Sequence, residues 1–354
     1  MSNEWAEALT LTGMEDIAAL REQGASVSVD TEAQPQLVDL SSLCVVDITG
    51  DDATSFLQGQ FSNDLGKVST EHAQITGYCT PKGRLLALPI VIGLHDGYRL
   101  LIPADIREGF LKRLSMFIMR AKVQVSERKD WTCTGIQTAR GGELGSLAGF
   151  LGNLPASVME VASDAHGQLL RWHDTDGSGS RARYLYVAEI PRQLALWREG
   201  EQLPKAGQAL WRLGDIRAGQ PSITAGVLEA FVPQMLNLQL VDGLSFTKGC
   251  YPGQEIVARM QYLGKLKRHM RRFSMPHAAD QVIPVPGDAL VTATDEDAGR
   301  VVDAVAGPDG LIELLAVVKV SGSDDSLSFQ GRTLSARELP YELPSLADVR
   351  QDAG

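Results

Sequence analysis

Short runs of alternating apolar and polar residues, separated by turn residues, recur along the first third of the chain. They predict strands over residues 37–48, 75–79, 85–94, 98–102 and 123–126. Helical spacing of apolar residues predicts helices over residues 3–24, 52–60, 104–120, 191–202 and 206–219. The strands and helices follow no regular βαβ rhythm, and no Gly-x-Gly-x-x-Gly follows a strand. The pattern therefore predicts an α+β fold and gives no support to a Rossmann fold.

The pattern changes beyond Phe273. Short β-rich runs there alternate with Gly, Pro and Asp turns, which is typical of a small antiparallel barrel or sandwich. The stretch 140–181 is rich in Gly, Ser and Asp, and is predicted to be a loop-bearing region. The predicted division of the chain is a region over 1–272, built from two intertwined α+β subdomains (approximately 45–125 and the rest), a C-terminal β-barrel over 273–345 and a tail over 346–354.

Composition narrows the classes of function. The chain has 354 residues and a net charge of −11, from 33 basic and 44 acidic residues. Such a charge excludes general binding of nucleic acid or anionic membrane, so an anion site must be a local patch. The N-terminus lacks the features of a signal peptide, and the longest apolar runs are too short to cross a bilayer, so we expect a cytoplasmic protein. Four widely spaced cysteines form neither a disulfide framework nor a metal-ligand set.

The segment from Ser245 to Arg259 is the most unusual in the chain. Its Tyr251-Pro252-Gly253-Gln254 suits a type II turn followed by a helix. Cys250 would then lie just before a helix N-terminus, where the partial positive charge stabilises a thiolate. The alternative, a buried structural cysteine, is about equally supported.

A run of basic residues without an acid follows this segment. Its members are Arg259, Lys265, Lys267, Arg268, Arg271 and Arg272. In an acidic chain this local positive stripe is able to hold a polyglutamyl tail, a pyrophosphate or RNA phosphates. The alternative is that these residues form a solvated linker before the barrel, which is what a run of charges alone usually indicates.

Two further features suit a planar heterocycle. Trp211 precedes a Gly-x-Pro helix exit and can offer a flat face, although a lone tryptophan more often belongs to the core. Gln58, Gln60, Asn63 and Asp64 gather side-chain amides and a carboxylate in one turn. Such groups suit the edge of a pterin, but they also serve as turn caps.

Taken together, Lys248-Gly-Cys-Tyr-x-Gly-Gln-Glu255 and the downstream Lys267-Arg268 resemble the YgfZ-type folate-binding family. That family is related to the T-protein of the glycine cleavage system and to the folate domains of dimethylglycine oxidase. The other matches, between about 45 and 272, are Leu57-Gln-Gly-Gln60 with Asn63-Asp64, Lys82-Gly83, Ala218-Gly219-x-Pro221 and Phe231-x-Pro-Gln234.

The resemblance implies a ring of antiparallel, ferredoxin-like domains around a central folate channel. It implies binding of tetrahydrofolate or a one-carbon derivative, and a role in iron–sulfur cluster assembly or repair that supports tRNA modification. The motif cysteine maps onto Cys250 as a reactive thiol, and no metal ligands are implied. The positions expected near the folate are Trp211, Leu43, Gln58, Gln60, Asn63, Lys248, Gly249, Tyr251, Gln254, Glu255, Arg259, Lys267 and Arg268.

Three departures bear on activity. Leu43 stands where the family has a second tryptophan. No carboxylate follows Gly83, and Arg217 replaces a folate-clamping glutamate of the transferases, so groups that position the ring or handle a proton are missing.

Three functions therefore compete. A folate-dependent maintenance factor is favoured over an aminomethyltransferase or demethylase and over a non-catalytic module that docks RNA or a partner. Iron–sulfur assembly proteins or cluster enzymes are the expected partners, direct tRNA binding stays open, and a monomer is expected.

Overall fold

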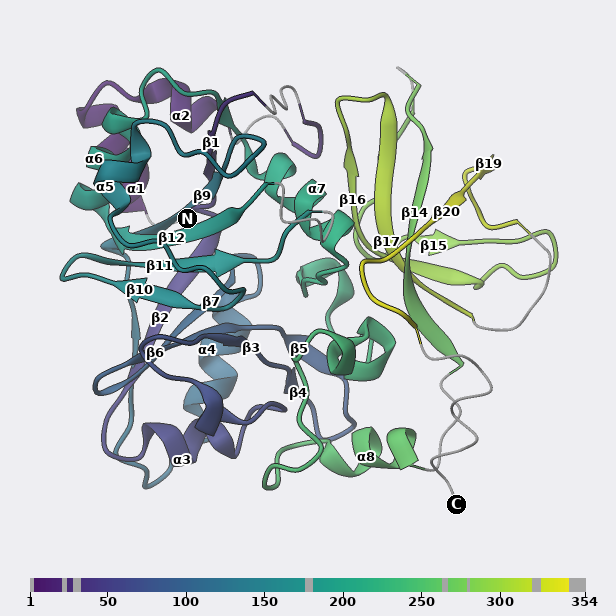
Figure 1. Ribbon diagram of the computed structural model, residues 1–354. Helices are drawn as coiled ribbons and strands as arrows, with labels where there is room; N and C mark the ends of the chain where they lie inside the picture. Colours follow the sequence, from purple (N-terminus) through teal and green to yellow (C-terminus); the bar gives the residue numbers. More distant parts are fainter. Residues whose placement is uncertain are drawn as a thin grey trace.

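The computed structural model of the chain describes residues 3–20, 24–27, 33–175, 181–262, 267–278, 281–319 and 326–343. Three β-sheets surround a middle segment that contains α7 (Gln208–Ala218) and the chain that follows it (Figure 1). Two sheets lie one above the other on the left of the view, and the third lies on the right. The predicted α+β class is confirmed.

The first sheet is antiparallel, in the order β3-β6-β7-β2-β8. Its strands are β2 (Leu43–Thr49), β3 (Gln74–Ile75), β6 (Ile90–Leu94), β7 (Gly97–Pro103) and β8 (Gln124–Glu127). The helices α3 (Ala53–Gln58) and α4 (Arg107–Ser115) bury their apolar faces in the same hydrophobic cluster as β2 and β7. A separate hairpin pairs β4 (Tyr78–Cys79) with β5 (Leu85–Ala87), across a turn at residues 80–83.

The second sheet has six strands, in the order β10-β11-β12-β9-β1-β13. They are β1 (Gln36–Asp39), β9 (Trp131–Gln137), β10 (Val161–Ser163), β11 (Gly167–Trp172), β12 (Arg183–Glu189) and β13 (Lys205–Ala206). The other pairings of this sheet are antiparallel, as expected, whereas β1 and β13 pair in parallel. A helical layer packs on this sheet through a second cluster, and it consists of α1 (Asn3–Leu11), α2 (Glu15–Ala19), α5 (Leu147–Leu151) and α6 (Ile190–Glu199).

The third sheet, in the order β15-β16-β17-β14-β20, is C-terminal. Its strands are β14 (Arg268–Pro276), β15 (Ala289–Leu290), β16 (Gly299–Ala306), β17 (Leu311–Lys319) and β20 (Ser335–Arg337), and a small hairpin joins β18 (Ser328–Phe329) to β19 (Arg332–Thr333). In the described part of the chain its two edge strands do not pair with each other. The C-terminal β-barrel expected over 273–345 is therefore a curled, open sheet, and it begins at Arg268.

The loop-bearing stretch 140–181 also contains regular elements, and its residues 176–180 lie outside the described residues. This stretch contributes α5, β10 and β11. Every residue of β11 is buried, because one face meets the helical layer and the other meets the middle of the molecule. A strand covered on both faces lacks the alternation of apolar and polar residues that identifies a strand in a sequence.

The chain ties the third sheet to the rest at several points. The Val27 amide donates to the Ala306 carbonyl at 2.9 Å, and the Ala306 amide donates to the Ala25 carbonyl at 2.8 Å, so the segment 25–27 pairs with the end of β16. Arg212 on α7 pairs with Asp303 on β16. Near the C-terminus, the Tyr341 hydroxyl donates to the Gly219 carbonyl at 2.9 Å. Within the described ranges, no helix combines the length and apolar character that a bilayer crossing requires.

Candidate functional site

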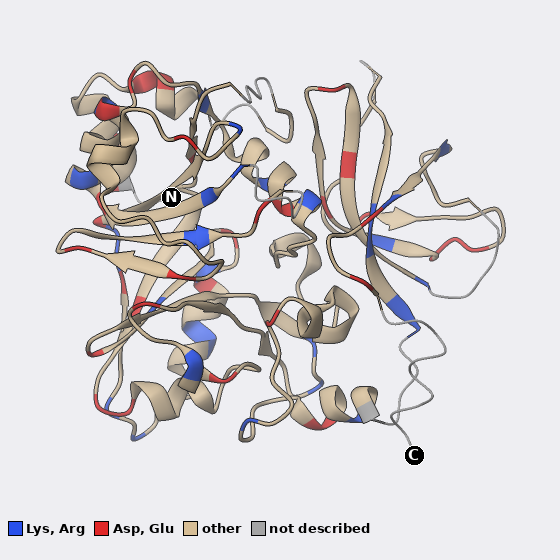
Figure 2. Ribbon diagram, in the orientation of Figure 1, with Lys and Arg blue, Asp and Glu red and all other residues tan. Residues whose placement is uncertain are grey.

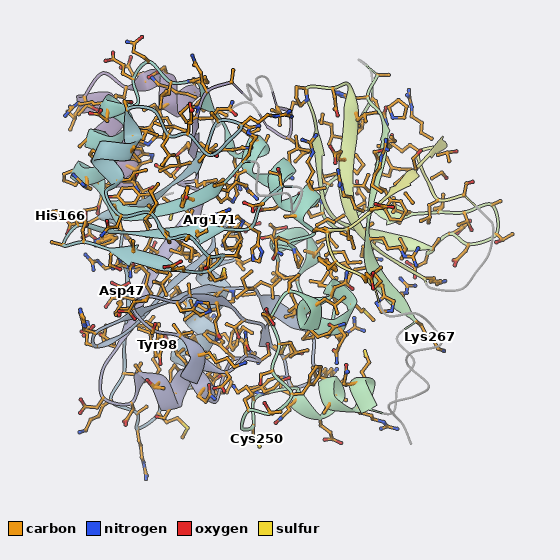
Figure 3. The ribbon with its side chains drawn as sticks, in the orientation of Figure 1. Asp47, Tyr98, His166, Arg171, Cys250 and Lys267 are labelled. Carbon is orange, nitrogen blue, oxygen red and sulfur yellow. The ribbon has the colours of Figure 1, made fainter. Side chains whose placement is uncertain are left out.

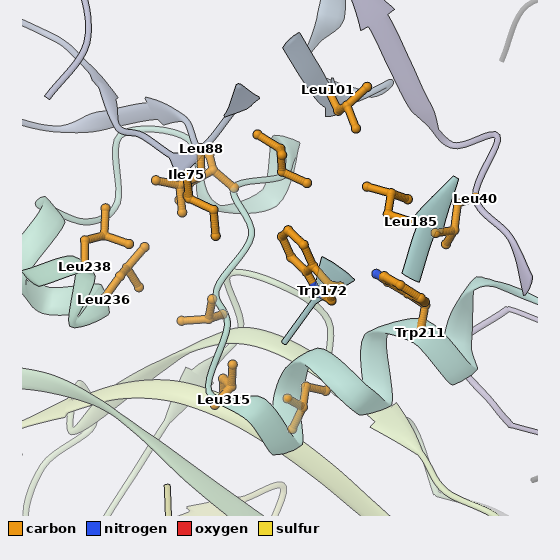
Figure 4. Packing of buried hydrophobic residues seen from close by; sticks show 14 of the residues in the cluster. Leu40, Ile75, Leu88, Leu101, Trp172, Leu185, Trp211, Leu236, Leu238 and Leu315 are labelled. Atoms are coloured by element: carbon orange, nitrogen blue, oxygen red, sulfur yellow. The ribbon is translucent and has the colours of Figure 1, made fainter. Parts of the chain in front are cut away.

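A cavity of about 500 Å³ lies where α7 faces both N-terminal sheets. Its walls are mostly aliphatic, and Figure 4 shows several of these side chains around two indole rings, those of Trp172 and Trp211. The aliphatic lining includes Leu40, Leu43, Ile75, Leu88, Ile90, Leu101 and Leu185. The structure thus brings the predicted Trp211 and Leu43 into one cavity.

The position of Trp211 depends on a glycine in the sheet beneath it. A β-carbon on Gly135 of β9 would lie 2.5 Å from Cε3 of the indole, so only glycine lets the ring lie this close to the strand. The guanidinium of Arg183 lies 4.0 Å from the centre of the ring. Trp211 is only 6% exposed, so it is at once a core residue and part of the cavity wall.

Trp172 was not singled out from the sequence. It ends β11, and its ring centre lies 6.4 Å from that of Trp211, with the planes 30° apart. Its Nε1 donates to Oδ1 of Asp215 at 2.7 Å. No strand was predicted within the loop-bearing stretch 140–181, because the fully buried β11 carries no periodic signal.

Two arginines and two aspartates around the cavity form ion pairs. Asp215 accepts from Arg183 at 2.9 Å, and Arg212 pairs with Asp303. Burial raises the pKa of the Asp215 carboxyl, while Arg183 opposes the rise. Burial likewise lowers the pKa of Arg183, against the attraction of Asp215. Both arginines are therefore already paired, and Asp105 adds a carboxylate that accepts from the Ala225 amide at 2.8 Å.

Three buried oxygens on the cavity wall have no hydrogen-bond partner in the described part of the chain. They are Oγ of Ser42, Oγ1 of Thr224 and Oε1 of Gln220. Gln220 occupies the variable position of the Ala218-Gly219-x-Pro221 motif, so the motif pointed to the right turn but not to this residue. Unpartnered buried oxygens of this kind are available to a ligand.

A second cavity, of about 650 Å³, adjoins the first. Ile75 and Gln220 line both cavities, so the two meet at these residues. Asn63 lines the second cavity, but its side chain is already committed, since its Nδ2 donates to the carbonyls of Ile75 at 2.9 Å and Asp242 at 2.6 Å.

The other amides of the 56–64 turn hold local structure. Gln58 donates to Asp64 at 2.8 Å and accepts from the Leu65 amide at 2.8 Å, so it caps the short 3₁₀ helix at Leu65–Lys67. Gln60 has a buried Oε1 without a partner among the described residues, and it lines neither cavity.

The Lys-Gly-Cys-Tyr motif lies away from both cavities. The Lys248 amine donates to the carbonyls of Gln58 and Phe61, each at 2.5 Å, and so locks the motif to the end of α3. Burial lowers the pKa of Lys248 to about 8. Tyr251 is buried, and burial raises the pKa of its hydroxyl.

The predicted turn before the next helix is present. The Gln254 amide donates to the Tyr251 carbonyl at 3.2 Å, and Gly253 has a φ of +85°, as a type II turn requires. The helix α8 (Gln254–Tyr262) begins directly after it, with Glu255 exposed in its first turn.

Cys250 lies at the surface, four residues before α8. Figure 3 shows it at the lower edge of the molecule, far from Lys267 in this view. Both Cys250 and the preceding Gly249 are exposed, whereas Cys44, Cys79 and Cys133 are buried. The alternative of a buried structural cysteine is therefore wrong for Cys250.

The predicted basic stripe is not continuous. Arg268 pairs with Asp297 at 2.7 Å, and Arg272 pairs with Glu313 at 2.6 Å, because these residues belong to β14 and not to a linker. Figure 2 accordingly shows basic and acidic residues side by side on the C-terminal sheet. Arg259 and Lys267 are exposed and line neither cavity, and Lys265 lies outside the described residues.

Arg217, which stands in place of the transferase glutamate, does not line either cavity. Its guanidinium pairs with Glu313 at 2.6 Å and thereby joins α7 to β17. Arg217 and Arg272 together hold the pKa of Glu313 below its usual range, against the effect of burial. Arg217 therefore stabilises the contact between α7 and the third sheet.

Leu88, in the run after Gly83 that lacks a carboxylate, forms part of the aliphatic cavity wall, as does Ile90 just beyond that run. In the described residues, no three His, Cys, Asp or Glu side chains gather closely enough to hold a metal ion.

Comparisons with known proteins agree with this architecture. No family model matches the chain. The tRNA-modifying protein YgfZ of Colwellia psychrerythraea is 31% identical over 320 residues, which cover 87% of this chain and 93% of the relative. The YgfZ protein of Vibrio vulnificus is 30% identical over 329 residues, which cover 88% and 94%.

Among solved structures, the glycine cleavage system aminomethyltransferase T of Bartonella henselae superposes with a TM-score of 0.65 over 87% of this chain and 86% of that one, at 16% identity. At this identity the likeness shows a shared fold. The chain therefore has the aminomethyltransferase fold and belongs to the family of the tRNA-modifying protein YgfZ.

Proposed function

We propose that this protein binds a reduced folate in the first cavity and supports iron–sulfur cluster assembly or repair, and through it tRNA modification. The observation that carries the folate proposal is the cavity wall itself. It combines two indole rings and an aliphatic lining with three buried oxygens that lack partners. Apolar walls with a few convergent polar groups are what a site for a flat organic ligand needs.

The donor set fits tetrahydrofolate or a one-carbon derivative. The aromatic and aliphatic walls suit the uncharged pterin and aminobenzoyl groups. The buried oxygens of Ser42, Thr224 and Gln220 can accept from ring or amino N–H groups. The arginines of the cavity are already paired with carboxylates. The anionic glutamate of the folate therefore belongs at the mouth of the cavity, near solvent. A bound folate would supply a one-carbon unit, and the residues named here would bind and orient it and exclude water.

The role in tRNA modification rests on family membership, since the relatives are named as tRNA-modifying proteins. The exposed Cys250 is the group proposed to act at the surface, held by Lys248 on one side and α8 on the other. Iron–sulfur assembly proteins or cluster enzymes are the proposed partners.

The folate proposal is tested by calorimetric titration of tetrahydrofolate and 5-formyltetrahydrofolate into the wild type and Trp211→Leu. Binding should weaken at least about tenfold in the variant, since roughly 1.4 kcal/mol of stacking and burial is lost. Trp197→Leu is the matched control, because it removes a buried indole from α6 in the helical layer, away from the cavity. Equal weakening in both variants would point to general destabilisation and would contradict the proposal.

The cellular role is tested separately. In a bacterial strain that lacks its own YgfZ relative, thiomethylated tRNA nucleosides are measured by mass spectrometry with the wild type, Trp211→Leu or Cys250→Ser. Restoration by the wild type and loss in both variants is expected. Full restoration by Cys250→Ser would favour a non-catalytic docking module.

An aminomethyltransferase or demethylase is the alternative. The first cavity does hold carboxylates, those of Asp105, Asp215 and Asp303, although Asp215 and Asp303 are engaged by arginines. An assay of one-carbon transfer to or from tetrahydrofolate decides between the two functions, and we expect no turnover.

A further inference from the structure

The end of α4 and the turn that follows it expose apolar side chains to solvent. Ten large apolar side chains are exposed in the described part of the chain, and three of them lie within four consecutive residues: Met116, Phe117 and Met119. Met119 is 86% exposed and Met116 is 71% exposed. Ile118, between them, packs against the cluster of the first sheet and so anchors the turn. Single exposed apolar residues are ordinary, but a concentration of this kind marks an interaction site.

The same surface carries basic side chains without an acidic partner. Lys112 and Arg113 lie in the last turn of α4, and Arg120 follows the turn. Within the described ranges, none of the three forms an ion pair. The segment 107–120 contains one acid, Glu108, which lies one helical turn before Lys112 and forms no ion pair with it. The surface is therefore locally positive, although the chain carries a net charge of −11.

Two aromatic rings hold the guanidinium of Arg113 in place of a carboxylate. The guanidinium lies 5.6 Å from the ring centre of Phe117 and 5.9 Å from that of the buried Tyr78. Its Nε is buried and has no hydrogen-bond partner among the described residues. Contacts with rings orient an arginine without neutralising it, so its charge stays available to a partner. The set formed by Met116, Phe117, Met119, Lys112, Arg113 and Arg120 is called the α4 patch below.

An RNA, an anionic membrane and an acidic protein surface are the candidates to cover a patch of this composition. RNA bases stack on flat rings, but two of the three exposed apolar residues are methionines, which have none. An anionic membrane would repel a chain with a net charge of −11. Methionine side chains are flexible and polarisable, and they adapt to the apolar face of a partner helix. Free cations beside them complement Asp and Glu at the margins of that face.

We propose that the α4 patch docks a partner protein through an amphipathic segment whose apolar face is flanked by Asp and Glu. The two methionines and Phe117 meet the apolar face, while the lysine and the arginines face the carboxylates. The inference goes beyond the proposed function and does not depend on folate, because no residue of the α4 patch lines either cavity. A failure of folate binding therefore leaves it untouched.

The test uses the full chain and three fluorescein-labelled synthetic peptides. The acidic peptide has leucines at helical spacing with glutamates between them, a second peptide has lysine for every glutamate, and a third has serine for every leucine. One patch variant combines Met116→Ser with Met119→Ser, and the other is Arg120→Glu. The controls are Leu11→Ser, at an α1 residue that is also 86% exposed, and Arg198→Glu, at an exposed residue of α6.

Fluorescence anisotropy should show that the acidic peptide binds the wild type at least about tenfold more tightly than either of the other peptides does. Both patch variants should lose about tenfold or more in affinity for it, and the controls should match the wild type. Added salt should weaken the binding, because exposed charges are screened. Melting temperatures should be equal in all variants, since each replaced side chain is exposed. Equal affinity for the acidic and lysine peptides would overturn the inference, and so would equal losses in patch and control variants.

The other occupants are tested with the same variants. The protein is sedimented with vesicles of phosphatidylglycerol and phosphatidylcholine, titrated with an unmodified tRNA, and examined alone by sedimentation velocity. We expect none of these assays to distinguish the patch variants from the wild type. Vesicle or tRNA binding that the patch variants lose would name that macromolecule as the occupant and overturn the inference. Self-association that the patch variants lose would overturn it in favour of a second copy of this chain, and failure of the acidic peptide to bind the wild type would overturn it outright.

Discussion

Gly83 and Gly253 lie so close together that a β-carbon on Gly253 would come within 2.6 Å of the Cα of Gly83. Both glycines have positive φ, +71° and +85°. The turn between β4 and β5 therefore docks on the turn before α8, backbone against backbone. Two motifs far apart in the sequence thus form one structural unit, which holds the loop of Cys250 in place together with Lys248.

Substitution of Gly253 by alanine should destabilise the protein by roughly 1–3 kcal/mol. Alanine is strained at a positive φ, and its β-carbon would also clash with the backbone of the neighbouring turn. Gly249→Ala is the control, since nothing lies within 4 Å of its β-carbon. The free energy of unfolding in urea checks both. If Gly253→Ala unfolds with the same free energy as Gly249→Ala, the proposed contact between the two turns does not exist.

One of the four thiols should react rapidly with an alkylating reagent, and the other three should react slowly. Cys250 is exposed, whereas the other three cysteines are buried. Burial raises the pKa of the Cys44 and Cys133 thiols, and it raises the pKa of Cys79 to about 12. Alkylation of the folded protein near pH 8 should therefore modify one cysteine rapidly and the others only on unfolding. Mass spectrometry after timed quenching identifies the sites. Rapid modification of Cys79 or Cys133 would show that the interior is more open than described.

Stability should respond to pH through Lys248. Burial lowers its folded-state pKa to about 8 from 10.5. Between these values the unfolded chain binds more protons at this residue than the folded chain does. Its contribution to the free energy of unfolding therefore rises with pH over this window. Denaturation of the wild type and Lys248→Met at about pH 7 and about pH 10 should show the wild type gaining relative to the variant. A constant difference between the two would mean that the amine keeps an ordinary pKa when folded.

Arg217→Glu should cost stability without creating transferase activity. The change places a second carboxylate beside the buried Glu313 and breaks the link between α7 and β17. A loss of about 3–5 kcal/mol is typical when one partner of a buried ion pair is removed. Arg268→Glu, on the same sheet, is the control, because its partner Asp297 is largely exposed and such pairs contribute about 1 kcal/mol or less. Denaturation curves that coincide for the two variants would rule out the structural role assigned to Arg217.

Much of the fold follows from local patterns, and the failures have physical causes. The alternating strands around Val46 and Leu100 and the type II turn at Gly253 were predictable, because each depends on neighbouring residues. Trp172 was not, since its strand is buried on both faces and shows no alternation. The basic residues near Arg268 were expected to form one positive stripe. In the structure they belong to β14, and Arg268 and Arg272 pair with different acidic residues. These partners depend on how the strands pair, and the sequence alone does not show that pairing.

For the site, sequence reasoning found Trp211 and Leu43 in the first cavity but missed Asp215 and Gln220. Both missed residues flank the Ala218-Gly219 turn. Their importance comes from burial next to an empty space, and a sequence does not reveal burial of this kind.

The central claim is that a reduced folate occupies the first cavity, and a crystal structure of the complex with 5-formyltetrahydrofolate tests it most directly. The account predicts electron density for the ligand between Trp211 and Leu43, with polar atoms within hydrogen-bond distance of Gln220. Density for the ligand outside both cavities, or none at concentrations where calorimetry shows saturation, would contradict it.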